Sequence, residues 1–289
     1  MQKYSIISLI KNAFSNHEKW DLAWKDSSPK KEYDVVIIGG GGHGLATAYY
    51  LAKEHNITNV AVIEKGWIGG GNVGRNTTII RSNYMHDDNG LFSEFGMNLW
   101  RRMSQDLNYN VMFSPRGIIN LAHSDAQMNV YARRGNSMRL NGIDAVLLNR
   151  EQVKEIIPMA DFSENVRFPI FGGLMQPSAG TARHDAVAWG YARQADSMGV
   201  DIIQNCEVKG IKRNGDSVES IETTKGIIKT KKIGVVAAGH SSVIANMVDL
   251  KLPLESKPLQ ALVSEPVKPI IDTVVMSNTI HAYVSQSDK

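Results

Sequence analysis

Residues 33–44 read Tyr-Asp-Val-Val-Ile-Ile-Gly-Gly-Gly-Gly-His-Gly, a short β-branched run that passes directly into glycines. An apolar helical pattern follows over residues 45–53, so the expected order is strand, tight turn and helix. Gly39, Gly41 and Gly44 occupy the three glycine positions of a G-x-G-x-x-G motif, which serve the turn, the approach of a pyrophosphate and close helix–strand packing. The predicted cofactor-binding turn contains Gly39, Gly41, Gly42, His43 and Gly44.

A second strand with an acidic end follows this helix. Residues 59–64 read Asn-Val-Ala-Val-Ile-Glu, and Glu64 stands about 20 residues after Gly44, where a carboxylate accepts hydrogen bonds from the ribose of an adenosine. If the glycines served only a sharp turn, Glu64 would have no role. An acid at this position also argues against the 2′-phosphate of NADP. The two features predict a dinucleotide site, but they do not distinguish FAD from NAD.

A second glycine-rich patch favours an extended cofactor. Residues 69–81 read Gly-Gly-Gly-Asn-Val-Gly-Arg-Asn-Thr-Thr-Ile-Ile-Arg, where a plain nicotinamide-binding domain continues with its next strand. Residues 200–208 predict another strand, and residues 232–239 predict a buried strand that ends in a turn of small residues. These strands return the chain to the dinucleotide-binding sheet.

Composition excludes several classes of protein. The chain has 289 residues, with 43% hydrophobic and 21% charged, which is ordinary for globular proteins and excludes a disordered or fibrous chain. A net charge of +3 without a dense basic stretch argues against a nucleic-acid partner. The single cysteine, Cys206, cannot form an internal disulfide or a zinc site, and no apolar run near the start suits a signal peptide or a spanning helix. We therefore expect a cytoplasmic protein without a metal or membrane partner.

The middle of the chain has a different pattern. Residues 117–122 predict a strand, residues 125–141 an amphipathic helix, and residues 149–158 a short helix ended by proline. The runs 259–264 and 273–277 predict further antiparallel strands. These elements form a block inserted between the dinucleotide-binding segments.

The predicted fold class is α/β, with a Rossmann-like FAD/NAD(P)-binding domain and an inserted α+β substrate domain built on an antiparallel sheet. The FAD-binding domain is expected over residues 33–112 and 179–254, and the substrate domain over residues 113–178 and 255–289. Residues 1–32 form an N-terminal arm, which is either loosely ordered or packs on a partner through its tryptophans.

Several stretches of the chain resemble one family. The sequence is similar to the beta subunits of heterotetrameric sarcosine oxidase, which belong to the FAD-dependent amine oxidases related to D-amino-acid oxidase. The resemblance begins near residue 33 and runs to the end of the sequence. Its most specific motifs are residues 39–44, 64–67, 75–84, 176–185 and 201–208.

The resemblance implies two flavins. It implies a non-covalent FAD and an FMN linked covalently to His184, with Arg183 beside it. His184 starts a helical pattern, where a helix N-terminus disfavours the imidazolium and leaves a neutral, nucleophilic ring. Without the resemblance, a histidine capped by or paired with Asp185 would be the stronger expectation. The implied FAD contacts beyond the glycine turn are Glu64, Lys65, Asn72, Thr77, Thr78, Ile79 and Val208.

Arg81 is the residue that the resemblance assigns to the substrate. It follows two isoleucines, in a pattern whose arginine holds the substrate carboxylate in the related amine oxidases. The planar guanidinium suits that bidentate contact, and the alternative is a surface salt bridge.

The implied activity is oxidative demethylation of sarcosine to glycine, with formation of hydrogen peroxide and transfer of the one-carbon unit to tetrahydrofolate. The implied partners are alpha, gamma and delta subunits, and NAD on a partner subunit. Two alternatives stay open: another FAD-dependent amino-acid oxidase or dehydrogenase subunit that oxidises glycine or proline, and a non-catalytic flavin-binding subunit. In the resembled family the chain continues further, so both domains are expected to lack a C-terminal part.

Overall fold

The structure is a computed structural model that describes residues 5–18, 20, 22–163 and 165–286. The chain divides into two compact units. Unit 1 contains the chain up to Asn76 together with Leu107–Tyr109 and His184–Gln260. Unit 2 contains Thr77–Asp106, Asn110–Arg183 and the chain from Ala261 onward.

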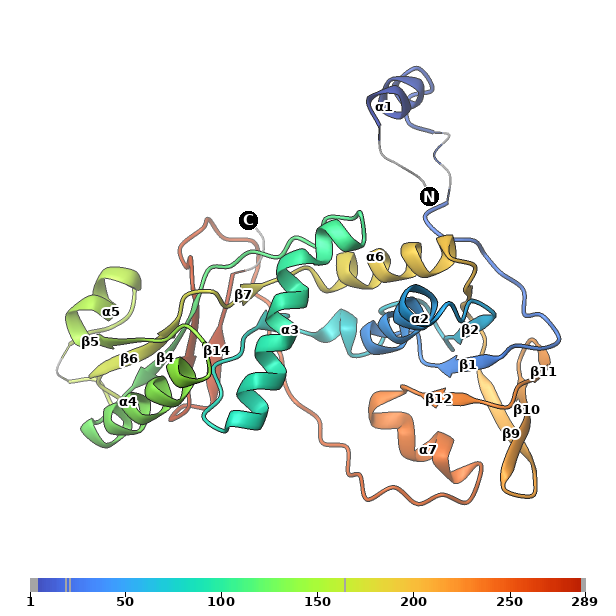
Figure 1. The fold of residues 1–289 in the computed structure, drawn as a ribbon. Helices are drawn as coiled ribbons and strands as arrows, with labels where there is room; N and C mark the ends of the chain where they lie inside the picture. Colours follow the sequence, from blue (N-terminus) through green and yellow to red (C-terminus); the bar gives the residue numbers. More distant parts are fainter. Residues whose placement is uncertain (1–4, 19, 21, 164, 287–289) are drawn as a thin grey trace. The chain divides into compact units, whose positions relative to one another are not determined.

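The parallel sheet of unit 1 forms where the sequence predicts it. In the described residues this sheet has four strands in the order β12 (Ile233–Val235), β1 (Val35–Ile38), β2 (Val60–Ile63) and β8 (Asp201–Ile203), all parallel. β1 and β2 are short apolar runs buried on both faces, as strands covered by helices are. α2 (Gly42–His55) follows β1, and α6 (His184–Ser197) packs against α2 (Figure 1).

Opposite faces of this sheet carry different partners. Ile37 points towards α2, close to Gly44. Val36 and Ile38 instead share a core with Ile244 of α7 (Ser241–Asn246). An antiparallel sheet of β9 (Val208–Asn214), β10 (Ser217–Thr223) and β11 (Gly226–Lys229) adds to that core. The remaining elements of unit 1 are α1 (Ile6–Ala13), η1 (Val73–Arg75) and η2 (Ala238–His240).

The strand predicted over residues 200–208 is wrong in one respect, because the structure divides it into β8 and β9. Asn205 has a φ of 51°, which ends the extended conformation. The Asn205 N–H donates to the Gly66 carbonyl oxygen at 2.8 Å, and the Cys206 N–H donates to that of Glu64 at 2.9 Å. These tertiary bonds turn the chain towards the end of β2.

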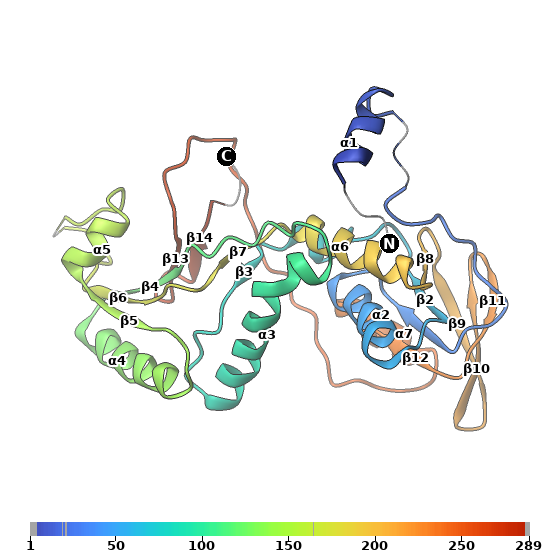
Figure 2. The ribbon, with the colours of Figure 1, turned by 45° about the horizontal axis from the view of Figure 1, so that its top comes forward.

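Unit 2 is built on a mostly antiparallel sheet (Figure 2). In the described chain, β13 and β4 run parallel and the other three pairs of this sheet run antiparallel. α5 (Arg150–Ile156) covers one face around Ile119 and Leu121, and α4 (Asp125–Leu140) covers the other around Ala122 and Leu174. The sheet order is β14 (Ala282–Val284), β13 (Val274–Ser277), β4 (Ile118–Ala122), β6 (Gly172–Gln176) and β5 (Val146–Asn149).

Local signals explain the helices of unit 2, which are α3 (Asp87–Asp106), α4 (Asp125–Leu140) and α5 (Arg150–Ile156). α5 begins at a capping box, in which the Asn149 side chain accepts from the Gln152 N–H and the Gln152 side chain accepts from the Asn149 N–H. The Ser124 side chain caps α4 in the same position.

These two units confirm the predicted fold class. The strand predicted over residues 259–264 is wrong, because this run pairs with no strand of the described chain and Leu259, Leu262 and Val263 are exposed. The predicted FAD-binding domain also includes residues 77–112, whereas the compact units divide at Asn76. They do so because β3 (Ile79–Ile80) pairs with β7 (Gly180–Thr181) inside unit 2. The functional domain boundaries stay a prediction.

Candidate functional site

Two glycines of the turn are required by the chain itself. Gly39 has a φ of 121°, and a Cβ on it would overlap the Val236 carbonyl oxygen. A Cβ on Gly44 would overlap the carbonyl oxygen of Gly39. The first and third glycines of the motif therefore allow the tight turn and the close contact between β1 and α2.

The middle of the turn is open instead. A Cβ on Gly41 or on Gly42 would meet no described atom closer than Val73 Cγ2, at 3.7 Å. Gly41 is the N-cap of the 14-residue helix α2 and has no side-chain cap, so the first N–H groups of the helix face outward. The chain itself does not need glycine at position 41, which is where a pyrophosphate approaches the backbone. This cradle fits a dinucleotide.

Glu64 lies beside the same turn. Its Oε2 accepts from the Gly40 N–H at 2.8 Å and its Oε1 from the Gly66 N–H at 2.9 Å. Each carboxylate oxygen keeps a further lone pair that can accept a ribose hydroxyl. Gly40 must lack a side chain here, because a Cβ would lie 2.8 Å from Glu64 Cβ. Sequence reasoning missed Gly40 and Gly66 as partners of the acid, although their place beside Glu64 and the motif was a usable signal.

The other predicted FAD positions of unit 1 are His43 within the turn, and Lys65, Asn72 and Val208 outside it. Val208 is buried in the core that also holds Ile63 and Cys206, at the start of β9. Among these predicted FAD positions, His43, Lys65 and Asn72 have exposed side chains. The structure thus brings Glu64 to the glycine turn and leaves the contacts of these four residues as predictions.

Arg81 lines an open cleft within unit 2. The cleft has a volume of about 330 Å³, and one of its walls is formed by β3 and Arg81. The other wall is α3, whose Phe92, Phe95 and Trp100 face the space. An apolar pocket with one cationic group suits a small molecule that carries both a carboxylate and a methyl group.

The Arg81 guanidinium is held by its own loop. Nη1 donates to Asn83 Oδ1 at 2.6 Å, and Cζ lies 4.6 Å from the centre of the Tyr84 ring. No ion pair joins Arg81 to a carboxylate of the described residues, so the predicted alternative of a surface salt bridge finds no partner there. Burial lowers the pKa of the neighbouring Arg134, and the positive charge of Arg81 lowers it further. The guanidinium groups of Arg81 and Arg134 therefore both lie beside Asn83.

The predicted flavin positions of unit 2 lie on the strand that leads to Arg81. Thr77 Oγ1 lies 3.1 Å from the Tyr283 hydroxyl. Thr78 has a φ of 53°, an uncommon conformation for a threonine, and its carbonyl oxygen accepts from the Ala182 N–H at 3.2 Å. Ile79 packs against the core around Ile118. The strained Thr78 is an observation that points to a functional constraint.

His184 is the first residue of α6, as the sequence predicts. Its Nδ1 is buried without a hydrogen-bond partner among the described residues, and lies 4.0 Å from Asp185 Oδ1. That distance is too long for a hydrogen bond but within reach of an ion pair when the ring is protonated, so the predicted alternative of pairing with Asp185 stays open. Arg183 precedes it at the end of unit 2, where its backbone N–H donates to the Val111 carbonyl oxygen at 3.1 Å. A ring nitrogen of His184 is therefore available for another group.

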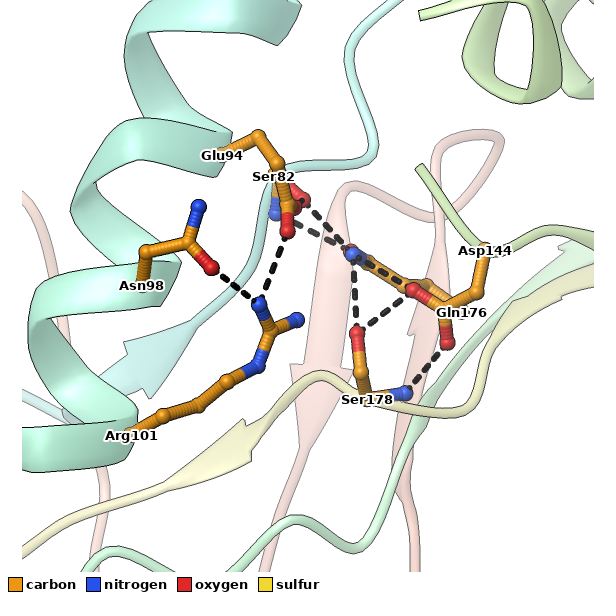
Figure 3. A network of polar contacts seen from close by, with 7 residues as sticks. All are labelled: Ser82, Glu94, Asn98, Arg101, Asp144, Gln176 and Ser178. Carbon is orange, nitrogen blue, oxygen red and sulfur yellow. Dashed lines mark hydrogen bonds and ion pairs between the residues drawn. The ribbon is translucent and has the colours of Figure 1, made fainter. Parts of the chain in front are cut away.

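A polar network follows Arg81, and no local sequence pattern predicts it. Figure 3 shows Ser82 in contact with Gln176 of β6 and Glu94 of α3. Gln176 and Ser178 both contact Asp144. The network comes from four separated stretches of the chain, which is why local pattern could not reveal it.

The residues that the structure describes contain neither a metal-binding cluster nor a membrane-spanning helix. No cluster of three or more histidine, cysteine, aspartate or glutamate side chains there has the geometry to bind a metal ion. None of its helices combines the length and the apolar character needed to cross a membrane.

The glycine cradle, the acid beside it and the fold define a class of flavoprotein. A family model described as FAD dependent oxidoreductase matches residues 34–289, and the chain belongs to this family. FAD is therefore its cofactor. The predicted fold class and the predicted enzyme class of FAD-dependent oxidoreductase are both confirmed.

The similarity is stronger to one group within the family. The chain is 58% identical over 287 residues to sarcosine oxidase subunit beta of Rhizobium meliloti, covering 99% of this chain and 69% of the relative. It is 51% identical over 289 residues to the protein of the same name from Rhodobacter capsulatus, covering 70% of that relative. The predicted resemblance is confirmed. Among solved structures, L-proline dehydrogenase from P. horikoshii is similar with a TM-score of 0.78 and 26% identity, covering 89% of this chain and 68% of that one.

Proposed function

We propose that the chain is the FAD-binding subunit of a sarcosine oxidase, which oxidises the N-methyl group of sarcosine and releases glycine. Two electrons leave the substrate and reduce dioxygen to hydrogen peroxide, and the one-carbon unit passes to tetrahydrofolate. The relatives that are named sarcosine oxidase subunit beta support the reaction. The observation that carries the proposal on this chain is Arg81, a cation without a described carboxylate partner, in a cleft with apolar walls.

The glycine turn and Glu64 hold the cofactor in this proposal. The N-terminus of α2 receives the pyrophosphate at Gly41, and Glu64 accepts the ribose hydroxyls. Bound FAD supplies the acceptor for the hydride equivalent that leaves the substrate carbon. The remaining FAD contacts in this proposal are the ones that the sequence predicts, at Gly42, His43, Lys65, Asn72, Thr77, Thr78, Ile79 and Val208.

Arg81 binds the substrate carboxylate. Its guanidinium has five N–H donors in a fixed plane, and one of them already donates to Asn83. The others are available for a bidentate contact with a carboxylate. The aromatic side chains of α3 offer an apolar contact for the methyl group of the substrate in this cleft.

His184 carries a covalent FMN in this proposal, with Arg183 beside the attachment site. The unpartnered, buried Nδ1 supports an imidazole that serves another group rather than the fold. His184 stands at the first position of α6, and bond formation to a flavin needs a neutral ring nitrogen as the nucleophile. Mass spectrometry of the His184 peptide from the native protein tests this assignment: a flavin adduct supports it, and an unmodified peptide throughout removes it.

The proposed assembly contains alpha, gamma and delta subunits, with NAD on one of the partners. The printed name of the relatives, subunit beta, supports a complex of several chains. The cytoplasmic location stays a prediction, based on the single cysteine.

A second candidate is oxidation of another amino acid, either proline or glycine. The structural similarity to an L-proline dehydrogenase favours proline among these. A third is a flavin-binding subunit without activity of its own. Turnover of the full-length, assembled protein with sarcosine, L-proline and glycine distinguishes the three. We expect the highest kcat/KM with sarcosine, together with hydrogen peroxide and a tetrahydrofolate-bound one-carbon unit. A preference for proline would reject the proposal, as would the absence of turnover.

A further inference from the structure

The loop that follows Arg81 is held in place by buried residues and hydrogen bonds, although it lies beside an open cleft. Ser82 and Asn83 are both fully buried. The Ser82 N–H donates to Gln176 Oε1 at 2.9 Å, and Gln176 Nε2 donates back to Ser82 Oγ at 2.7 Å. This reciprocal pair fixes the backbone immediately after Arg81 to strand β6.

The same serine joins the two walls of the cleft. The Ser82 hydroxyl donates to Glu94 Oε2 at 2.6 Å (Figure 3). Glu94 lies on α3 between Phe92 and Phe95, which line the opposite wall. Arg101 of the same helix donates to Glu94 Oε1 at 3.0 Å. The part-buried Ser82–Glu94 hydrogen bond therefore ties the wall that carries Arg81 to the aromatic wall.

Arg134 contacts the backbone of Asn83, and the Asn83 side chain contacts Arg81. The backbone carbonyl oxygen of Asn83 accepts a close contact from Arg134 Nη2. Its Oδ1 accepts from Arg81 Nη1 at 2.6 Å, whereas its Nδ2 is buried without a hydrogen-bond partner in the described chain. The amide of Asn83 therefore makes one hydrogen bond, and that bond orients the guanidinium.

Tyr84 provides a second constraint on the same group. The Arg81 guanidinium carbon lies 4.6 Å from the ring centre, a distance typical of stacking between a guanidinium and an aromatic face. A hydrogen bond fixes one edge of the guanidinium plane and the ring fixes its tilt. Together they leave little rotational freedom to the donors that remain.

We propose that Asn83 and Tyr84 are positioning residues that aim the free N–H groups of Arg81 at a carboxylate in the cleft of unit 2. The inference rests on the proposed role of Arg81 in substrate binding. It adds that carboxylate selectivity depends on two residues that need not touch the ligand. Because the backbone of the loop is fixed by Ser82, Gln176 and Arg134, changes at the side chains of Asn83 and Tyr84 act on Arg81 rather than on the loop.

The test compares two ligands that differ only in charge. Methoxyacetate has the shape of sarcosine without its amine, and methoxyacetamide is its neutral counterpart. Both are titrated into the flavin-loaded, full-length assembled protein, and binding is followed by the change in flavin absorbance. The readout is the ratio of the two dissociation constants, because a general structural defect weakens both ligands alike.

Asn83→Ala is expected to raise the dissociation constant for methoxyacetate about ten-fold, and that for methoxyacetamide by less than about two-fold. Asn98→Ala is the matched control. It also removes an asparagine oxygen that accepts from an arginine at 2.6 Å, here Arg101, but Asn98 is exposed and does not line the cleft. We expect this control to leave the ratio unchanged.

Tyr84 gives an independent pair of variants if Asn83→Ala does not fold. Tyr84→Leu is expected to reduce carboxylate selectivity, and Tyr84→Phe to preserve it, because the phenyl ring keeps the stacking surface. In an Arg81→Ala background, Asn83→Ala is expected to have no further effect on the ratio.

The outcomes separate this inference from the proposed function. The inference is overturned if Arg81→Ala abolishes carboxylate selectivity but Asn83→Ala leaves the ratio of the two dissociation constants unchanged. That result covers both equal weakening of the two ligands and no weakening of either. If Arg81→Ala binds methoxyacetate as tightly as the unmodified protein, the role of Arg81 in the proposed function fails, and the inference fails with it.

Discussion

Substitution of single glycines in the turn distinguishes what the fold needs from what the cofactor needs. Gly41→Ala places a methyl group where the nearest described atom of the chain, Val73 Cγ2, is 3.7 Å away. The unfolding free energy of the apoprotein should then fall by only about 0.5 kcal/mol, since alanine is a poorer N-cap than glycine. The same methyl group lies in the path of the pyrophosphate. Loss of one hydrogen bond to a charged group costs about 1.5–3 kcal/mol, so the dissociation constant for FAD should rise about ten- to a hundred-fold.

Two neighbouring substitutions are controls for this result. Gly42→Ala meets the same open space within the turn, but it stands at an unspecified position of the motif, so FAD affinity should fall by much less than with Gly41→Ala and the helix should be slightly more stable. Gly44→Ala overlaps the Gly39 carbonyl oxygen and should destabilise the apoprotein by about 2 kcal/mol or more. Flavin fluorescence titration measures the affinities, and denaturant unfolding measures the stabilities. If Gly41→Ala bound FAD as tightly as the unmodified protein, the proposed cradle would be refuted.

Three further predictions follow from individual contacts. Arg81→Lys should raise KM for sarcosine about ten-fold or more with unchanged FAD content, because an ammonium cannot make a bidentate contact; loss of FAD instead would give Arg81 a structural role. Burial raises the pKa of Tyr33 well above its ordinary value of 10.0, and its hydroxyl donates to Asp201 Oδ2 at 2.9 Å. Tyr33→Phe should therefore lower the unfolding free energy by about 1 kcal/mol at pH 7, measured by denaturant unfolding. Above pH 10 the Tyr33 hydroxyl ionises in the unfolded state but not in the folded state, so the unmodified protein loses stability through this group and the variant does not. The deficit of the variant should therefore shrink above pH 10, and a constant deficit would contradict this. Asn149→Ala should cost about 1 kcal/mol through loss of the α5 capping box, and an unchanged midpoint of thermal unfolding would show that the cap does not stabilise the unit.

The features that were predictable from sequence are those in which the backbone dictates the residue type. Gly39 and Gly44 are glycines because any side chain would collide with a carbonyl oxygen, so the turn appears directly in the sequence. The apolar runs of β1 and β2 are buried on both faces, and buried parallel strands have this continuous pattern. Glu64 follows from its position at the end of β2.

The features that were missed depend on contacts between distant residues. The division of the strand predicted over 200–208 results from hydrogen bonds of Asn205 and Cys206 with the end of β2, and no local pattern reports them. The cleft beside Arg81 depends on the aromatic side chains of α3, which read in the sequence as an ordinary apolar face. Asn83 and Gln176 gain their roles only when β6 and the loop after β3 come together.

The central claim is that this chain presents sarcosine to a bound flavin. The most direct measurement is anaerobic addition of sarcosine to the flavin-loaded, full-length assembled protein, with N-methylglycinamide, which lacks the carboxylate, as the control. We predict bleaching of the oxidised-flavin absorbance by sarcosine, and much weaker bleaching by the amide, because Arg81 has no carboxylate to bind in it. An oxidised spectrum that persists in excess sarcosine would contradict the account.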